Sequence, residues 1–159
     1  MLSRYFIDKQ PLNFRYVDLM LALWPNAKVI HCRRNARDTA LSLWSQAFVE
    51  EVQGYAYDFA DIAMVMRDAE RLMAHWRKYY AASMHEVRYE QLAADPSGVI
   101  GALAAWLGMP AAVAETTKAA SSIATASLWQ ARKPEYTRSV ERWRHYADAV
   151  PELLKFTAV

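Results

Sequence analysis

The stretch KVIHCRRNARDTALSLW, residues 28–44, decides the fold, because an apolar run passes into an amphipathic segment across a group of basic residues. Residues 28–32 are short and apolar enough to form a central strand of a parallel sheet. From Asn35 onward, apolar side chains recur at helical spacing. The sequence therefore predicts a strand, a turn at Arg33 and Arg34, and a helix.

This junction has the chemistry of an anion-binding site. Backbone N–H groups and the dipole at a helix N-terminus favour a phosphate, and arginine adds a planar fork of donors that matches phosphate oxygens. No glycine precedes Gly54, and the motif G-x-x-x-x-G-K-[ST] does not occur in the sequence. A nucleotide site built from this sequence alone would therefore lack the usual cradle for 5′-phosphates.

The remaining sequence alternates between strand-like and helix-like segments, which predicts an α/β domain with a parallel sheet. Residues 121–137 lack periodicity and predict a long loop. The predicted strands are 3–8, 28–32 and 86–89, and the predicted helices are 14–24 (capped by Asn13), 35–47, 59–80, 96–106 (begun by Asp95 and Pro96) and 139–146.

The composition of the sequence indicates which class of protein to expect. The chain has 159 residues, 54% of them hydrophobic, and is sized for one domain with a sizeable core. Its single cysteine, Cys32, excludes a disulfide framework and is predicted to be a small core residue. No Cys or His cluster suggests a metal site.

The charge and hydropathy of the sequence indicate which binding partners to expect. The net charge of +2 is too small to indicate general binding of nucleic acid. The sequence contains neither a signal-peptide core nor a run approaching the roughly 18 apolar residues of a membrane span. We therefore expect a cytoplasmic protein with no membrane partner.

Four separated motifs occur in order along the chain: DKQPLN (8–13), PNAKVIHCRRN (25–35) with Asp38 and Ser42, RYEQL (88–92), and TASLWQAR (125–132) continuing to Trp143. Together they resemble those of the sulfotransferases that use 3′-phosphoadenosine 5′-phosphosulfate (PAPS). The likeness is closest to the bacterial sulfotransferase domains often fused to tetratricopeptide repeats and to the tyrosylprotein sulfotransferases. It implies a P-loop-NTPase-like sulfotransferase fold, with a short parallel sheet flanked by helices.

The resemblance implies roles in binding the nucleotide. In this family an arginine at a strand end and a serine eight residues later bind the 3′-phosphate, and they correspond to Arg34 and Ser42. That spacing of about two helical turns returns the hydroxyl to the side of the arginine. The tyrosine of the RYE motif, Tyr89, is implied to contact the adenine side. Arg132 and Lys133 are implied to clamp phosphates when a nucleotide-covering loop, about 121–138, closes.

The resemblance also implies the reaction. PAPS would donate a sulfonate to an acceptor hydroxyl, which attacks the sulfur in line without an obligatory metal. Lys9 is implied to lie near the transferred sulfonate, and Ser127 to reach the same region. The sequence offers no residue as the general base of the acceptor.

In this family a strand, a Gly/Ser/Thr-rich phosphate loop and the general base come before the region that the sequence matches. We therefore expect residues 1–159 to be a single partial sulfotransferase domain, truncated at its N-terminus, with a homodimer or a complementing N-terminal segment as partner. Two alternatives stay open. One is a catalytically inactive nucleotide-binding remnant or split half, and the other is a dimerising interaction protein with an unpaired sheet edge.

Overall fold

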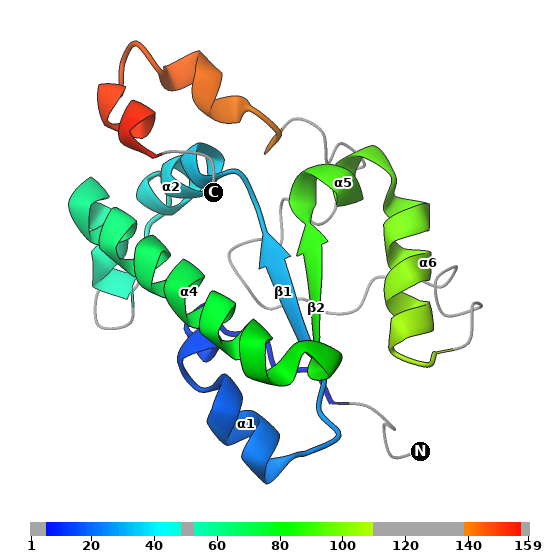
Figure 1. The fold of residues 1–159 in the computed structure, drawn as a ribbon. Coiled ribbons are helices and arrows are strands. Elements are labelled where there is room, and N and C mark those ends of the chain that lie inside the picture. Colours follow the sequence, from blue (N-terminus) through cyan, green and yellow to red (C-terminus); the bar gives the residue numbers. More distant parts are fainter. Residues whose placement is uncertain (1–5, 49–52, 110–138, 157–159) are drawn as a thin grey trace.

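Two parallel strands form the centre of the molecule, and helices surround them (Figure 1). The computed structural model describes residues 6–48, 53–109 and 139–156. The register pairs Val29 with Met84 and Arg33 with Arg88. The predicted mixture of helices with a short parallel sheet is confirmed. The strands are β1 (Val29–Arg33) and β2 (Met84–Arg88), and the α-helices are α1 (Val17–Leu23), α2 (Ala36–Trp44), α4 (Phe59–Tyr80), α5 (Tyr89–Ala94) and α6 (Pro96–Trp106).

Side-chain caps set the starts of three helices. Asn35 Oδ1 accepts hydrogen bonds from the backbone N–H groups of Arg37 and Asp38, at 3.0 and 3.3 Å, and α2 begins there. Asp58 caps α4, and Asp95 caps α6 through the N–H of Gly98. The helix starts predicted near residues 35, 59 and 96 are therefore confirmed.

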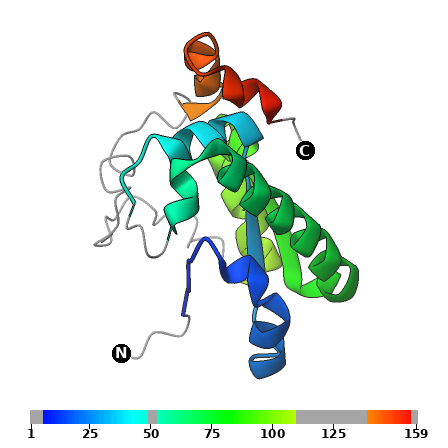
Figure 2. The same ribbon diagram turned by 90° about the vertical axis from the view of Figure 1, so that its left-hand side faces the viewer.

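The C-terminal part of the described chain lies over α2, as both ribbon views show (Figures 1 and 2). It consists of two short 3-10 helices, η6 (Arg142–Tyr146) and η7 (Pro151–Lys155). Leu153 and Ile62 are fully buried in a core cluster that this segment shares with α2 and α4. A second cluster joins α1, α4 and the starts of both strands, with Val17, Leu21, Met73 and Met84 as its buried members.

The two faces of the sheet differ because successive side chains of a strand point in opposite directions. Arg33 and Glu86 lie on the face beneath α4, where Glu70 of α4 pairs with Arg33. Ile30 points to the other face and is 41% exposed. The prediction that Cys32 is a core residue is wrong, because its side of β1 is exposed in the described part of the structure.

Two other predictions near the N-terminus are wrong. Phe6 and Ile7, expected in a strand, are 92% and 86% exposed and not in a strand, because no described segment pairs with them. Asn13 does not cap a helix; its Nδ2 donates to Asp8 Oδ2 at 2.8 Å. The chain instead makes a 3-10 turn, η1 (Asn13–Arg15), before α1. Residues 3–5 of the predicted strand lie outside the described residues.

Two predicted boundaries near the pocket and the C-terminus also differ. Tyr89, placed in a strand by the sequence, is the first residue of α5, which was not predicted; good helix formers such as Glu90 and Leu92 follow it. The helix predicted over 139–146 is the shorter η6. The predicted loop 121–137 lies outside the described residues. No helix in the described ranges is long and apolar enough to cross a membrane.

Truncation of the α4 core residue should destabilise the protein far more than truncation of its exposed neighbour. Ile62→Ala removes a side chain that is 0% exposed, so we expect its free energy of unfolding to fall by about 2–5 kcal/mol. Met64, on the same helix, is 52% exposed, and Met64→Ala should cost about 0.5 kcal/mol or less. Denaturation in guanidinium chloride measures both, and equal losses would contradict the described core.

Candidate functional site

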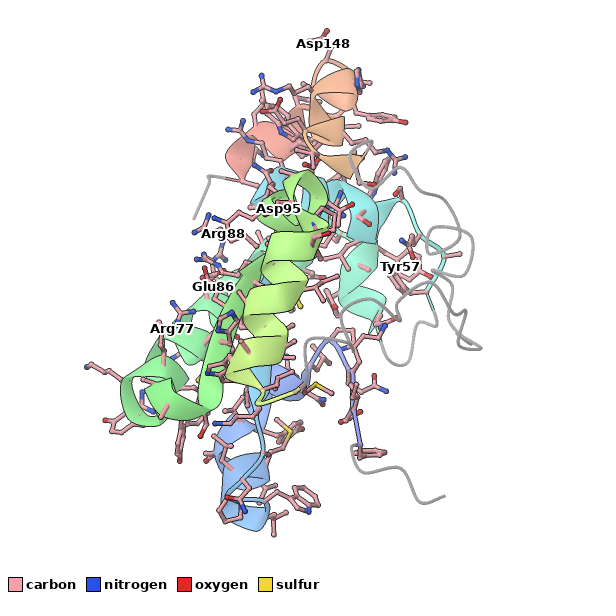
Figure 3. The ribbon with its side chains drawn as sticks, turned by 90° about the vertical axis from the view of Figure 1, so that its right-hand side faces the viewer. Tyr57, Arg77, Glu86, Arg88, Asp95 and Asp148 are labelled. Atoms are coloured by element: carbon pink, nitrogen blue, oxygen red, sulfur yellow. The ribbon has the colours of Figure 1, made fainter. Side chains whose placement is uncertain are left out.

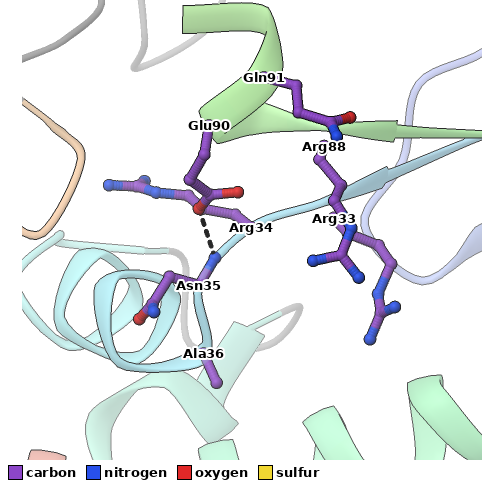
Figure 4. Close-up of a pocket in the computed structure, with 7 residues that line it drawn as sticks. All are labelled: Arg33, Arg34, Asn35, Ala36, Arg88, Glu90 and Gln91. Carbon is purple, nitrogen blue, oxygen red and sulfur yellow. Dashed lines mark hydrogen bonds between the residues drawn. The ribbon is translucent and has the colours of Figure 1, made fainter. Parts of the chain in front are cut away.

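A pocket of about 360 Å³ lies at the carboxyl ends of β1 and β2 (Figure 4). Parallel strands bring their ends to one edge of a sheet, where open α/β sheets commonly bind ligands. Three of its residues are arginines, which gives the pocket a positive lining. The lining residues are Arg33, Arg34, Asn35, Ala36, Arg88, Glu90 and Gln91.

A hydrogen bond joins the start of α2 to α5 across this pocket. Glu90 Oε1, on α5, accepts from the backbone N–H of Asn35 at 2.7 Å (Figure 4). Tyr89 precedes Glu90, and the bond therefore fixes its position relative to the end of β1. The Arg34 Cζ atom lies 4.9 Å from the centroid of the Tyr89 ring, in cation–π geometry. Two predicted nucleotide-binding residues, far apart in the sequence, are thus in contact.

Three backbone N–H groups at the start of α2 are already hydrogen-bonded. Asn35 donates its N–H to Glu90, while Arg37 and Asp38 donate theirs to the Asn35 side chain. The expectation that free N–H groups at this helix N-terminus bind an anion is therefore wrong for these three residues. The positive character of the pocket comes from its arginine side chains instead.

Two of the pocket arginines are compensated by a carboxylate. Glu86 Oε1 lies 3.6 Å from Arg33 Nη1 and 3.4 Å from Arg88 Nε. Glu86 Oε2 lies 2.6 Å from Arg77 Nη2, and Figure 3 shows Arg77, Glu86 and Arg88 in a row along the molecule. Burial opposes ionisation of Glu86, but the hydrogen bond from Arg77 and the charges of Arg33 and Arg77 outweigh it and lower the pKa of Glu86. This network is mainly structural.

Arg34 differs from the other two arginines. It makes no ion pair within the described ranges, and its half-buried side chain runs to the opposite side of Glu90 from Arg33 and Arg88 (Figure 4). Its Nη2 donates to the Ser139 carbonyl at 2.6 Å, while its Nε is buried and has no hydrogen-bond partner. A buried donor without a partner costs free energy, and an anionic ligand would satisfy it.

The structure brings together only part of the predicted site. Ser42 is half-buried on α2, and no hydrogen bond joins it to Arg34 in the described part of the chain. Lys9 is exposed and does not line the pocket. Ser127, Arg132 and Lys133 lie outside the described residues. Within the described ranges, no group of three or more His, Cys, Asp or Glu residues could hold a metal ion.

Sequence reasoning gave no role to Asp38 and Glu90, although both belong to the motifs that it identified. Asp38 is only 1% exposed, and its carboxylate accepts hydrogen bonds from the N–H groups of Glu141 and Trp143. Glu90 holds Asn35, as described above. The signal for both was an acidic residue inside a motif, but their backbone partners were not visible in the sequence.

The described architecture is that of an α/β protein with a positively lined pocket at the ends of its parallel strands. The model of the sulfotransferase family matches residues 1–115, a range that includes Lys9, Arg34, Ser42 and Tyr89 and ends before Ser127. The chain therefore belongs to the sulfotransferase family.

The chain is also similar to an uncharacterized protein of Aquifex aeolicus (strain VF5), with 39% identity over 144 residues. The alignment covers 88% of this chain and 19% of that relative. The chain thus spans less than one fifth of the length of the relative that it matches. No solved structure matches the chain.

The Glu86 network should make stability depend on pH. Because the pKa of Glu86 is lowered in the folded state, its contribution is present above the ordinary value of 4.5 and is lost as the pH falls through the folded value. The difference in unfolding free energy between the wild type and Glu86→Gln should therefore be largest near neutral pH and shrink below about pH 4.5. Urea unfolding from about pH 7 to about pH 3 measures it; a difference that stays constant would contradict the network.

Proposed function

We propose that this pocket binds the 3′-phosphate and the adenine side of PAPS and of its product adenosine 3′,5′-bisphosphate. The protein would serve the transfer of a sulfonate from PAPS to an acceptor hydroxyl. Membership of the sulfotransferase family supports the class of reaction. The observation that carries the proposal for the site is the Arg34 guanidinium, which has no carboxylate partner among the described residues and a buried, unpaired Nε.

Charge and donor geometry favour a phosphate at Arg34. A phosphate monoester carries a charge of about −1.5 to −2 at neutral pH and accepts several hydrogen bonds. A guanidinium has five N–H donors, and the Ser139 carbonyl accepts from one of its nitrogens. Bidentate contacts to the remaining donors are stronger in a half-buried site than in water.

We propose that Tyr89 and Ser42 also contact the nucleotide. The Tyr89 ring lies against Arg34. If the adenine lies beside Tyr89, the 3′-phosphate on its ribose would therefore be close to the Arg34 guanidinium. Ser42 lies one helical turn after Asp38 on α2, and we propose that its hydroxyl donates to the same phosphate. Arg132 and Lys133 are proposed as further phosphate ligands.

In the proposed reaction, the acceptor oxygen forms a bond to sulfur while the bond from sulfur to the 5′-phosphate oxygen breaks. The leaving bisphosphate gains negative charge, which cations and hydroxyl donors stabilise. We propose Lys9 and Ser127 for this part of the site. The acceptor loses its proton to a base that we do not assign, and the 5′-phosphosulfate would be held by a further segment or a second chain, since this sequence has no Gly-rich phosphate loop.

The 3′-phosphate should be the group that Arg34 recognises. In calorimetric titrations, Arg34→Ala should lose about 1.5–3 kcal/mol of binding free energy for adenosine 3′,5′-bisphosphate, the range for hydrogen bonds to charged groups. Affinity for AMP, which lacks the 3′-phosphate, should not change. Arg71→Ala, which removes a largely exposed arginine from α4, is the control and should bind both nucleotides like the wild type. An equal loss for both nucleotides would overturn the proposed role.

Lys9 should affect turnover and not nucleotide affinity. We expect Lys9→Ala to lower the rate of sulfonate transfer from PAPS to a phenol by about 100-fold, the scale of losing one charge-stabilising donor, with the Kd for adenosine 3′,5′-bisphosphate unchanged.

The exposure of Lys9 favours the second candidate function, a nucleotide-binding protein without turnover. Wild-type protein that binds the bisphosphate and transfers no sulfonate would identify that second function.

A further inference from the structure

We propose that Asp38 is a positioning residue for Arg34. It docks residues 139–156 onto the first turn of α2, and this C-terminal segment holds the Arg34 guanidinium in the orientation that receives the 3′-phosphate. The inference rests on the proposed function and adds to it a residue that does not touch the nucleotide.

The Asp38 carboxylate makes an unusually specific connection. Its Oδ2 accepts from the Glu141 N–H at 2.8 Å, and its Oδ1 accepts from the Trp143 N–H at 2.9 Å. These partners lie 103 and 105 residues further along the chain. Asp38 is only 1% exposed, so water cannot replace these partners. A carboxylate oxygen that lost its amide would be a buried hydrogen-bond acceptor without a donor, which would destabilise the fold. The carboxylate therefore holds the backbone of the C-terminal segment at a defined place.

The docked backbone is directly connected to Arg34. Ser139 lies two residues before Glu141, and its carbonyl accepts from Arg34 Nη2 at 2.6 Å. The backbone of Glu141 is in the left-handed region, with φ of 57°. A connection of two residues leaves the Ser139 carbonyl little freedom once the Glu141 N–H is fixed. Asp38 thereby restricts the position of the Arg34 guanidinium, although the two side chains need not touch.

Arg37 gives the same segment a second, independent attachment. Its Nε donates to the Phe156 carbonyl at 2.9 Å, and its Cζ lies 4.3 Å from the centroid of the Trp143 ring. Consecutive residues of α2 thus hold both ends of the C-terminal segment, which lies over α2 in Figures 1 and 2. A guanidinium that is already held loses less conformational entropy when it binds an anion.

The proposal is tested by the preference for adenosine 3′,5′-bisphosphate over AMP, measured by calorimetry. We expect Asp38→Asn to reduce this preference about tenfold, because an asparagine side chain accepts with one oxygen only and loses one of the two amides. Hydrogen exchange at the Glu141 and Trp143 amides should become faster. Arg37→Gln should change both quantities in the same direction. Asp61→Asn, in the first turn of α4, is the matched control and should change neither.

The outcomes separate this inference from the proposed function. A wild-type protein with no preference for the bisphosphate would refute the function itself, whatever the variants do. A wild-type preference that Asp38→Asn and Arg37→Gln both retain, although their Glu141 and Trp143 amides exchange faster, would overturn the positioning role alone. If Asp38→Asn does not fold by near-ultraviolet circular dichroism, Arg37→Gln, which keeps the carboxylate, decides the matter by the same two measurements.

Discussion

The arrangement around the pocket depends on the two hydrogen bonds that the buried carboxylate of Asp38 accepts. This carboxylate satisfies two backbone amides of a segment more than a hundred residues away, and it does so from the first turn of the helix that follows β1. Asn35 starts that helix and is itself held by Glu90. The first turn of α2 therefore joins β1, α5 and the C-terminal segment. Few other positions in the described chain connect elements so distant in the sequence.

The arginines of the pocket form two groups, which differ in whether a carboxylate lies beside them. Glu86 pairs with Arg33 and Arg88 beneath α4, and Glu70 of α4 also pairs with Arg33, so these arginines stabilise the sheet and its helix. Arg34 lies on the other side of the Asn35–Glu90 hydrogen bond and keeps its charge uncompensated among the described residues. A charge that is half-buried and unpaired is expensive for a fold that does not use it. This contrast is the reason why we propose Arg34, and not Arg33 or Arg88, as the arginine that binds the nucleotide.

Local signals in the sequence predicted β1 and the starts of α2, α4 and α6, but they failed at the N-terminus and at Tyr89, where the structure depends on contacts with distant segments. Asn35 and the Asp95–Pro96 pair marked helix starts because capping depends only on near neighbours. The burial of Cys32 was predicted wrongly because burial depends on which segments cover β1. Resemblance to a family implied that Arg34 and Tyr89 both bind the nucleotide, but not that they contact each other. Asp38 gained a role only when its distant backbone partners were known.

The parallel pairing of β1 with β2 has a consequence for the order of folding during synthesis. The strands can pair only after the ribosome has made the intervening α4, a long helix whose contacts are largely local. Residues 139–156 emerge later still, so β1, β2 and α4 can associate before Asp38 finds its amides. The sheet can therefore form on the nascent chain before the Ser139 carbonyl, which accepts from Arg34, has been made.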